Sequence, residues 1–369
     1  MSSDLVERIG SEIRRNGPIS FARFMDLALY DAAGGYYARG GAVLGPSGDF
    51  FTASDVGRLF GASIARQLLE IDQRIGPLDP FHVIEFGSGR GLLARDVLDA
   101  MAEIDSGLAS RLHYLLVDRS RAMLEESRRR IPEGRSLEPA ELQGGLCGSV
   151  LAVELFDALP VHRVRRRGGR LVELLVGLGD DGTLVELEGP CSPEVRTMAE
   201  RYGVAADEGT EADLAPAVDA QLDTMAGCLD RGVMLIVDYG ERANALHDGS
   251  RPQGTLLAYH RHTTNRSYLE RVGQQDLTAH VNFSALEDRA RALGLRVLGL
   301  TTQDRFLISN GILEVFRPDD PARLHDPRRV KLRLQAMQLI HPSGMGRRFK
   351  VLALAKGCDP VLTGLRDPF

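Results

Sequence analysis

The spacing of apolar residues changes several times along the chain, and each spacing predicts a kind of element. Apolar positions recur at helical intervals over residues 5–30, with an interruption at Gly17-Pro18, and again over residues 56–75. From Phe81 onward, short apolar runs alternate with further helical stretches. Alternation of this kind predicts an α/β fold with a parallel, doubly wound sheet covered by helices on both faces.

Two later stretches depart from this simple alternation. Residues 161–188 contain strand-like runs separated by glycine turns, which predicts an inserted β-hairpin, and a helical stretch follows. Residues 239–282 are polar and are predicted to form a loop. We therefore expect an N-terminal helical cap and one sheet domain with two insertions. The predicted ranges are 1–75 for the cap, 76–358 for the sheet domain, and about 160–215 and 241–282 for the insertions.

Composition and charge limit the classes of function. The chain has 369 residues, a formal net charge of -6 and a pI near 5.9. Proteins that hold nucleic acid by bulk electrostatics are basic, so we expect no nucleic-acid partner. The apolar run at residues 233–237 is too short to cross a bilayer, and the first residues lack an apolar signal sequence. Four scattered cysteines without a CxxC pair favour a reducing compartment, so we expect a cytoplasmic protein without membrane attachment.

A glycine-rich loop gives the strongest local evidence for a ligand. The sequence Val83-Ile-Glu-Phe-Gly-Ser-Gly-Arg-Gly91 lies where an apolar strand is predicted to turn into a helix, the nucleotide-binding edge of a Rossmann-like sheet. Gly87, Gly89 and Gly91, with Ser88 between the first two, let the backbone approach a ligand closely. A dinucleotide site usually has the spacing G-x-G-x-x-G, whereas this loop has G-x-G-x-G.

Two acidic residues decide between the nucleotide chemistries that share such a loop. Glu85 precedes the loop on the strand, where its carboxylate would repel a pyrophosphate but attract the methionyl ammonium of S-adenosylmethionine. Asp118 ends the next predicted strand, where a carboxylate can accept hydrogen bonds from both hydroxyls of a ribose. We therefore predict S-adenosylmethionine as the cofactor and disfavour the alternative of a nicotinamide-dependent dehydrogenase.

Six further groups of residues stand in order along the chain and carry a family resemblance. They are Ala32-Ala-Gly-Gly-Tyr-Tyr37, Gly48-Asp-Phe-Phe-Thr-Ala53 with Phe60-Gly61, Glu154-Leu-Phe-Asp-Ala-Leu-Pro-Val161, Val237-Asp-Tyr-Gly240, Gly254-Thr255 with Tyr259 and His262, and Asp276-Leu-Thr-Ala-His-Val-Asn-Phe283. Together they resemble the MidA-like family of class I methyltransferases over nearly the whole chain. The resemblance implies a Rossmann-like class I methyltransferase sheet. It also implies an arginine methyltransferase, because mitochondrial members of that family methylate an arginine in a respiratory complex I subunit.

The resemblance also assigns residues to the cofactor and to the methyl acceptor. It implies that the three glycines form the cofactor loop, that Asp118 binds the ribose, and that Phe51 and Thr52 reach over the cofactor. It implies that Glu154 and Asp157 line the acceptor site. This chain departs from the family pattern at two places.

Both departures lie close to the adenine or the acceptor. The residue before the acceptor-side acid is Val153, where the family commonly has asparagine or histidine. No tryptophan follows the third strand, and Leu137 or Glu138 lies near that position instead. These differences leave the substrate less defined than the reaction class.

The predicted acceptor residues suit a guanidinium. Two carboxylates can hold its planar fork and direct one nitrogen toward the methyl group. Asp157 has an alternative role as a helix N-cap. His280 is a candidate general base or acceptor contact, with a loop histidine bonded to backbone as the equal alternative. His260 and His262 lack nearby ligands at metal spacing, so we expect no metal.

The identity of the partner stays open between three hypotheses. The first is a protein arginine N-methyltransferase acting on a protein partner. The second is a small-molecule or peptide O- or N-methyltransferase, and the third is an assembly factor that binds S-adenosylmethionine without turnover. The basic run Arg163-Val-Arg-Arg-Arg167, continuing to Arg170, is either a solvated strand face or an edge that docks a protein. A homodimer is also left open.

Overall fold

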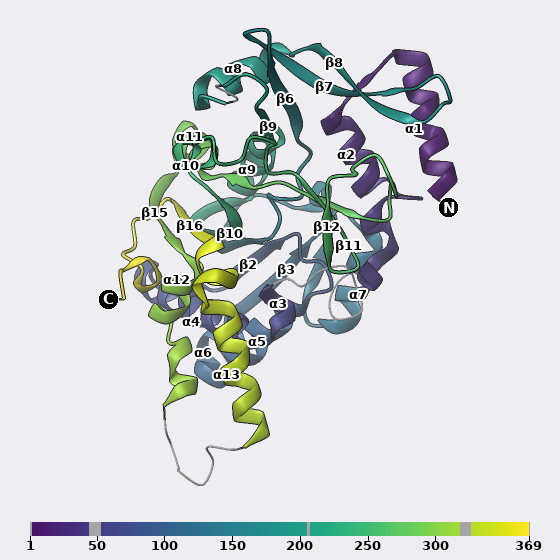
Figure 1. Cartoon of the computed structure of the whole chain (residues 1–369). Coiled ribbons are helices and arrows are strands. Elements are labelled where there is room, and N and C mark those ends of the chain that lie inside the picture. Colours follow the sequence, from purple (N-terminus) through teal and green to yellow (C-terminus); the bar gives the residue numbers. More distant parts are fainter. Residues whose placement is uncertain (1, 44–52, 205–206, 318–325, 369) are drawn as a thin grey trace. The chain divides into compact units, whose positions relative to one another are not determined.

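The computed structural model describes residues 2–43, 53–204, 207–317 and 326–368 (Figure 1). Contacts divide the chain into two compact units. The sheet unit consists of Phe51–Leu155, Asp223–Tyr239 and Arg289–Phe369. The hairpin unit consists of Met1–Phe50, Phe156–Leu222 and Gly240–Asp288. The predicted cap, residues 1–75, extends beyond the first segment of the hairpin unit, which ends at Phe50. The last part of the predicted cap contains the helix α4 (Leu59–Ile75), which packs into the core of the sheet unit.

The sheet unit is built on one sheet whose central strands are buried on both faces. In spatial order they are β4 (Arg135–Leu137), β3 (Leu112–Val117), β2 (Phe81–Phe86), β5 (Leu146–Val153), β10 (Leu229–Glu241), β16 (Phe349–Lys356) and β15 (Arg296–Thr302). Neighbouring pairs from β4 to β10 are parallel. The strand β16 runs antiparallel to both β10 and β15, a departure from the predicted all-parallel sheet.

The order of the strands reverses between β2 and β5. From β2 the chain continues outward through β3 to β4, and it then returns to the other side of β2 to form β5. Such a reversal opens a crevice at the carboxyl ends of the two strands, where ligands of doubly wound sheets bind. The glycine-rich loop begins directly after β2, so the topology puts it at this point.

Helices cover the sheet and join it at one large apolar core. This core combines Val83, Leu151 and Leu235 of the strands with Phe60 and Ile64 of α4. The helical elements of the unit are α3 (Ala53–Val56), α4, α5 (Leu92–Ile104), α6 (Ser106–Arg111), α7 (Arg121–Arg130), η2 (Pro139–Glu141), α12 (Gln303–Ser309), η3 (Ile312–Phe316), α13 (Pro327–Ile340), η5 (Pro342–Gly346) and η6 (Thr363–Leu365). Two further helices, α9 (Ala217–Cys228) and α11 (Phe283–Ala292), cross the boundaries between the units.

The hairpin unit contains the predicted β-hairpin together with additional helices and strands. Its helical elements are α1 (Ser2–Asn16), α2 (Phe21–Tyr30), η1 (Tyr36–Val43), α8 (Pro193–Tyr202) and α10 (Ala243–Leu246). One sheet has the order β1 (Ile19–Ser20), β7 (Arg170–Leu178), β6 (His162–Arg167) and β9 (Glu211–Leu214). The strand β8 (Leu184–Pro190) also pairs with β7, in antiparallel orientation.

The prediction of a polar loop over residues 239–282 was wrong. That stretch contains the small sheet β12 (Thr263–Asn265), β11 (Leu257–His260) and β13 (Asp276–Thr278), and β14 (Val281–Asn282) pairs with the end of β10. These strands are short, and Asp276 and Gln275 are buried polar residues, so the sequence has no apolar run to indicate them. Within the described ranges, no helix is long and apolar enough to cross a membrane.

Candidate functional site

The glycine-rich loop is held by backbone hydrogen bonds to the neighbouring strand. The amides of Gly87 and Ser88 donate to the Val117 carbonyl oxygen at 2.8 and 3.3 Å. Gly87, Gly89 and Gly91 have φ angles of 69°, 50° and 72°, in the left-handed region that glycine adopts without strain. The loop geometry therefore depends on glycine at these positions.

The three glycines have different surroundings. A Cβ at Gly91 would lie 3.2 Å from the Cβ of Ser127 in α7, so this position allows the loop to pack on the helix. A Cβ at Gly87 would lie 3.0 Å from Cδ1 of Leu155. At Gly89 the nearest atom is 4.0 Å away, so this glycine faces open space among the described residues. The Gly89 position leaves room for a ligand to approach the backbone.

Asp118 fastens the end of β3 to the same loop. Its Oδ2 accepts a hydrogen bond from the Gly89 amide at 2.9 Å, and its Oδ1 accepts one from the Ser120 amide at 2.8 Å. Burial raises the pKa of the Asp118 carboxyl, although the backbone amides that donate to it act in the opposite direction. A carboxylate oxygen can accept more than one hydrogen bond, so this geometry is compatible with the predicted contact to a ribose.

Glu85 is buried beneath the loop. The Tyr114 hydroxyl donates a hydrogen bond to Oε2 of Glu85 at 2.6 Å. Burial raises the pKa of Glu85 to about 8, and the charge of Asp118 adds to this effect, while the hydrogen bond from Tyr114 opposes it. A cation beside Glu85 would favour the ionised form, which is the environment that a methionyl ammonium provides.

Ser88 and the end of β4 complete the surroundings of the loop. The Ser88 side-chain oxygen is buried and has no hydrogen-bond partner in the described part of the chain, so it is available to a ligand. The Leu137 carbonyl oxygen accepts a hydrogen bond from the Asp118 amide at 3.3 Å, and Glu138 pairs with Arg121 at 2.8 Å. Leu137 and Glu138 therefore lie beside Asp118, whereas the predicted Phe51 and Thr52 lie outside the described residues.

An ion pair that the sequence analysis missed connects the loop to α3. The Arg90 guanidinium contacts the Asp55 carboxylate, and both side chains are largely buried. The Arg90 carbonyl oxygen also accepts a hydrogen bond from Arg130 at 2.6 Å. The two partners are 35 positions apart, and no local pattern marks them as a pair.

Glu154 has an unusual backbone conformation next to the loop. It follows β5 directly and has a φ of 52°, which a residue with a side chain rarely adopts. Its amide donates to the Val237 carbonyl oxygen at 2.9 Å, and its Oε1 accepts a hydrogen bond from the Ala53 amide at 2.7 Å. Strained backbone of this kind is concentrated at functional sites. Glu154 thus lies at the carboxyl end of β5 and supports the start of α3.

The hairpin unit contains a second acidic group. Asp157 is buried, and its carbonyl oxygen accepts a hydrogen bond from the Ala279 amide at 2.9 Å. Asp276 is also buried and accepts a hydrogen bond from the Tyr37 hydroxyl at 3.1 Å. The pKa of Tyr37 lies well above its usual value. Burial is the main cause, and the charges of nearby groups, including Asp276 and Asp157, raise the pKa further. Asp276 could not be predicted as a site residue, because its partner lies 239 positions away in the sequence.

His280 follows Ala279 in the same segment. Its backbone amide donates a hydrogen bond to Oγ1 of Thr255 at 3.1 Å, and Oγ1 of Thr255 in turn donates to Asp213 at 3.1 Å. These bonds fix the backbone at His280. The role of its side chain as a base or acceptor contact remains a prediction.

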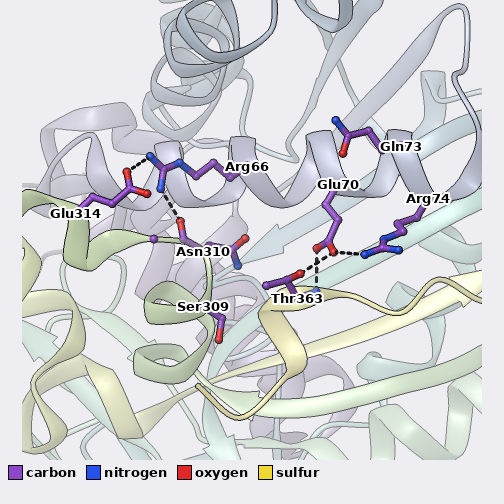
Figure 2. Close-up of a pocket in the computed structure, with 9 residues that line it drawn as sticks. Arg66, Glu70, Gln73, Arg74, Ser309, Asn310, Glu314 and Thr363 are labelled. Carbon is purple, nitrogen blue, oxygen red and sulfur yellow. Dashed lines mark hydrogen bonds and ion pairs between the residues drawn. The ribbon is translucent and has the colours of Figure 1, made fainter. Parts of the chain in front are cut away.

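Figure 2 shows a cavity of about 590 Å³ on another part of the sheet unit. Arg66 donates to Glu314 at 2.6 Å and to the Asn310 carbonyl oxygen at 3.1 Å, and Glu70 accepts hydrogen bonds from the amide and hydroxyl of Thr363. These charged groups bind the chain to itself, so we do not select this cavity as the functional site. Within the described residues, no group of three or more His, Cys, Asp or Glu side chains could hold a metal ion.

The strand order, the glycine loop at the reversal point and the carboxylate at the end of β3 define a class I S-adenosylmethionine-binding methyltransferase fold. Residues 63–301 match the model of a family described as S-adenosyl-L-methionine-dependent methyltransferase. The match covers more than half of the chain, so the chain belongs to this family. It is an S-adenosylmethionine-dependent methyltransferase.

Relatives of established name are similar over most of the chain. The mitochondrial protein arginine methyltransferase NDUFAF7 homolog of Drosophila melanogaster is 27% identical, and the alignment covers 96% of this chain and 85% of that protein. The human mitochondrial protein arginine methyltransferase NDUFAF7 is 26% identical over 93% of this chain and 81% of that protein. These names overturn the expectation of a cytoplasmic protein, because the relatives are mitochondrial.

Solved structures agree with the fold. A Burkholderia thailandensis protein with S-adenosyl-homocysteine bound has a TM-score of 0.89 and 30% sequence identity, and the comparison covers 98% of this chain and 94% of that chain. A second structure from the same organism has a TM-score of 0.87 and 31% identity, with 99% and 94% covered. The predicted fold class, cofactor and family are therefore confirmed.

Proposed function

We propose that this methyltransferase transfers the methyl group to an arginine side chain of a protein partner. The names of the fly and human relatives support a protein arginine as the acceptor. The observation that carries the proposal is Glu154, whose left-handed backbone, with φ of 52°, turns an acidic residue at the strand end beside the cofactor loop.

The cofactor residues act by binding and orienting. We assign Gly89 and the Ser88 hydroxyl to contacts along the ligand, Asp118 to the ribose and Glu85 to the methionyl ammonium. Gly87 and Gly91 shape the loop, while Leu137 and Glu138 lie on the adenine side, and Phe51 and Thr52 are proposed to cover it. When bound, S-adenosylmethionine supplies an electrophilic methyl group on a sulfonium.

The acceptor residues position the nucleophile. A guanidinium has five N–H donors in a planar fork, and a carboxylate that accepts two of them directs the remaining nitrogen. We assign this contact to Glu154, with Asp157 as a second acidic contact, because each is an acid that follows β5. The buried pair of Asp276 and the Tyr37 hydroxyl supports an acidic environment near Asp157. His280 is proposed to accept the proton that the guanidinium loses.

The test uses purified protein with S-adenosylmethionine labelled in the methyl group. The acceptors are proteins extracted from cells that lack this gene. We expect label in methylated arginine after acid hydrolysis. The Glu154→Gln variant keeps an amide oxygen that can accept from the Ala53 amide. It should therefore bind S-adenosylhomocysteine with wild-type affinity in calorimetry but transfer methyl at least a hundredfold more slowly.

The control and the alternatives give distinct results. Glu103→Gln changes the same functional group at a side chain that is 68% exposed, and it should leave transfer unchanged. Label in small molecules, or at oxygen, would replace the protein arginine with another acceptor. Wild-type binding of cofactor without any transfer would instead favour an assembly factor that does not turn over.

A further inference from the structure

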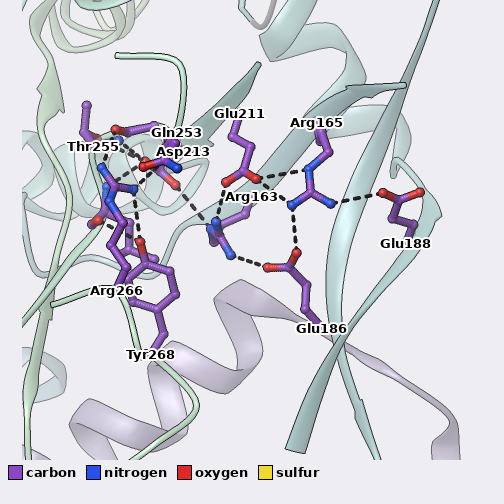
Figure 3. Close-up of polar contacts among 12 residues, drawn as sticks. Arg163, Arg165, Glu186, Glu188, Glu211, Asp213, Gln253, Thr255, Arg266 and Tyr268 are labelled. Atoms are coloured by element: carbon purple, nitrogen blue, oxygen red, sulfur yellow. Dashed lines mark hydrogen bonds and ion pairs between the residues drawn. The ribbon is translucent and has the colours of Figure 1, made fainter. Parts of the chain in front are cut away.

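The basic strand β6 presents its arginines on two faces with different surroundings. Side chains alternate along a strand, so Arg163, Arg165 and Arg167 share one face and Arg166 lies on the other. Figure 3 shows the first face, where Arg163 binds Glu186 at 2.5 Å and Glu211 at 2.6 Å. The Arg163 guanidinium also lies over an aromatic ring, 4.9 Å from the centroid of Tyr268.

The other arginines of this face are likewise used within the unit. Arg165 binds Glu186 and Glu188 at 3.0 Å each and Glu211 at 2.5 Å. Arg167 binds Glu188 at 2.9 Å. This acid-matched face stabilises the hairpin sheet, so it does not supply a basic surface to a partner.

A cavity of about 490 Å³ lies beside the helix α8, and Arg166 from the other face of β6 is among the residues that line it. Three arginines line it, Arg166 and Arg170 from the hairpin and Arg196 from α8. Apolar residues, namely Leu171, Ala199 and Val204, share the lining with Gly203 and a single acid, Glu200. Arg170 and Arg196 have no ion-pair partner among the described residues, so the charge of this pocket is not balanced there as it is on the first face.

We propose that this pocket docks an acidic peptide segment, containing apolar residues, of the protein that is methylated. The inference rests on the proposed function for the identity of that protein. Arginine forks bind carboxylates in a bidentate manner, and the apolar lining favours a side chain next to the acidic residue. The volume lies in the range of pockets that enclose specific ligands.

The composition of the pocket favours a peptide over nucleic acid. Binding of single-stranded nucleic acid commonly uses aromatic side chains that stack on bases, and none of the lining residues is aromatic. The chain as a whole carries a net charge of -6, which opposes a long polyanion more than a short peptide. A peptide also brings apolar side chains for Leu171, Ala199 and Val204, which a phosphate backbone lacks.

The binding test uses a fluorescein-labelled hexapeptide, Glu-Leu-Glu-Glu-Leu-Glu, and fluorescence anisotropy with the full chain. We expect the double variant Arg170→Gln with Arg196→Gln to weaken binding at least tenfold. The matched control Arg167→Gln removes one charge that is paired with Glu188 and does not line the cavity, so it should change binding less than twofold. The corresponding peptide with lysine in place of glutamate should not bind.

Several results would overturn the docking site. These are no binding of the acidic hexapeptide by the wild type, equal binding by the double variant, or tighter binding of inorganic phosphate or of a single-stranded RNA 12-mer. Methyl transfer separates this inference from the proposed function. If the wild type methylates arginine, the double variant should raise KM for the acceptor protein at least tenfold while kcat and the affinity for S-adenosylhomocysteine stay unchanged.

An unchanged KM in the double variant would remove the docking role and leave arginine methylation standing. Conversely, if the wild type methylates no arginine yet binds the acidic hexapeptide through Arg170 and Arg196, the proposed function fails. The pocket would then still be an acidic-peptide site, but the link to the methyl acceptor would be refuted.

Discussion

Glu85 should make cofactor binding depend on pH. Burial raises the pKa of its carboxyl group to about 8, the hydrogen bond from the Tyr114 hydroxyl opposes this, and the charge of Asp118 adds to it. Glu85 is therefore mostly protonated at neutral pH. A methionyl ammonium placed beside it favours the carboxylate, so binding of S-adenosylmethionine should release a proton.

The magnitude follows from this pKa. With a pKa of about 8, the ionised fraction of Glu85 is about one half at pH 8 and about one hundredth at pH 6. If binding requires the ionised form, the association constant falls about fiftyfold over this range, which is about 2.3 kcal/mol. At pH 7, close to one proton should leave for each cofactor bound.

The assay is calorimetric titration with S-adenosylmethionine between pH 6 and pH 9, repeated in buffers of different ionisation enthalpy to count protons. The matched variant is Glu85→Gln, which keeps the shape and the bond from Tyr114 but cannot ionise. The cofactor's own amino group titrates identically with both proteins, so the difference between the two pH profiles isolates Glu85. Parallel profiles with equal proton counts would refute the role assigned to Glu85.

The unliganded protein gives a second measurement of the same group. The folded-state pKa of Glu85 is raised above its unfolded value, from 4.5 to about 8, so the folded state binds more protons between these values. The contribution of Glu85 to the free energy of unfolding is therefore present below about pH 4.5 and is lost as the pH rises through about 8. Denaturant titrations should show this decline in the wild type and a flatter profile in Glu85→Gln.

Three further substitutions test the packing around the sites. Gly91→Ala should cost about 1–3 kcal/mol of stability in thermal unfolding, because the residue has a φ of 72° and its new Cβ would lie 3.2 Å from Ser127. The control Gly227→Ala should leave thermal unfolding unchanged, because its Cβ would meet no atom within 4 Å. Gly364→Ala should lower the thermal midpoint by several degrees, because its Cβ would lie 2.6 Å from a Phe306 ring carbon, and an unchanged midpoint would show that the C-terminal turn can move. Arg163→Met should cost about 1.5–3 kcal/mol in denaturant unfolding, because it removes a buried guanidinium and its ion pairs with Glu186 and Glu211. Arg167→Met, at a side chain 66% exposed, should cost under about 1 kcal/mol. Equal losses for the two would contradict the assignment of the buried face.

Most strands of the central sheet could be predicted because they are compact apolar runs. The first run, which begins at Phe81, and the run at residues 233–237 lie within β2 and β10. The strand β4 has the sequence Arg-Ser-Leu and no apolar run, so it could not be predicted in this way. The direction of β16 could not be predicted, because an apolar run buried on both faces has the same composition in parallel and antiparallel pairing. The strands β11 and β13 were missed for the opposite reason, since they are only four and three residues long, and β13 includes the buried polar residues Asp276 and Thr278.

The cofactor loop and the acceptor residues differ in how far their information is spread along the sequence. The loop lies within nine consecutive residues after one strand, and its glycines have the left-handed φ angles that the pattern implies. The acceptor side depends instead on distant partners, since Glu154 is held by Ala53 from 101 positions away and Asp276 by Tyr37 from 239 positions away. A local pattern cannot contain such pairs, because the folding of the intervening chain brings them together.

The basic hairpin shows how a sequence can indicate charge without indicating its use. Arg163 and Arg166 stand in one basic run, and the sequence alone left open whether this run is a solvated face or a docking edge. The strand period separates them, because the acids on β8 and β9 neutralise one face while the other meets α8, which brings a further arginine. Opposite faces of one strand thus meet different neighbours, and this is the basis for proposing different functions for Arg163 and Arg166. Substitutions that compare the two faces test that difference.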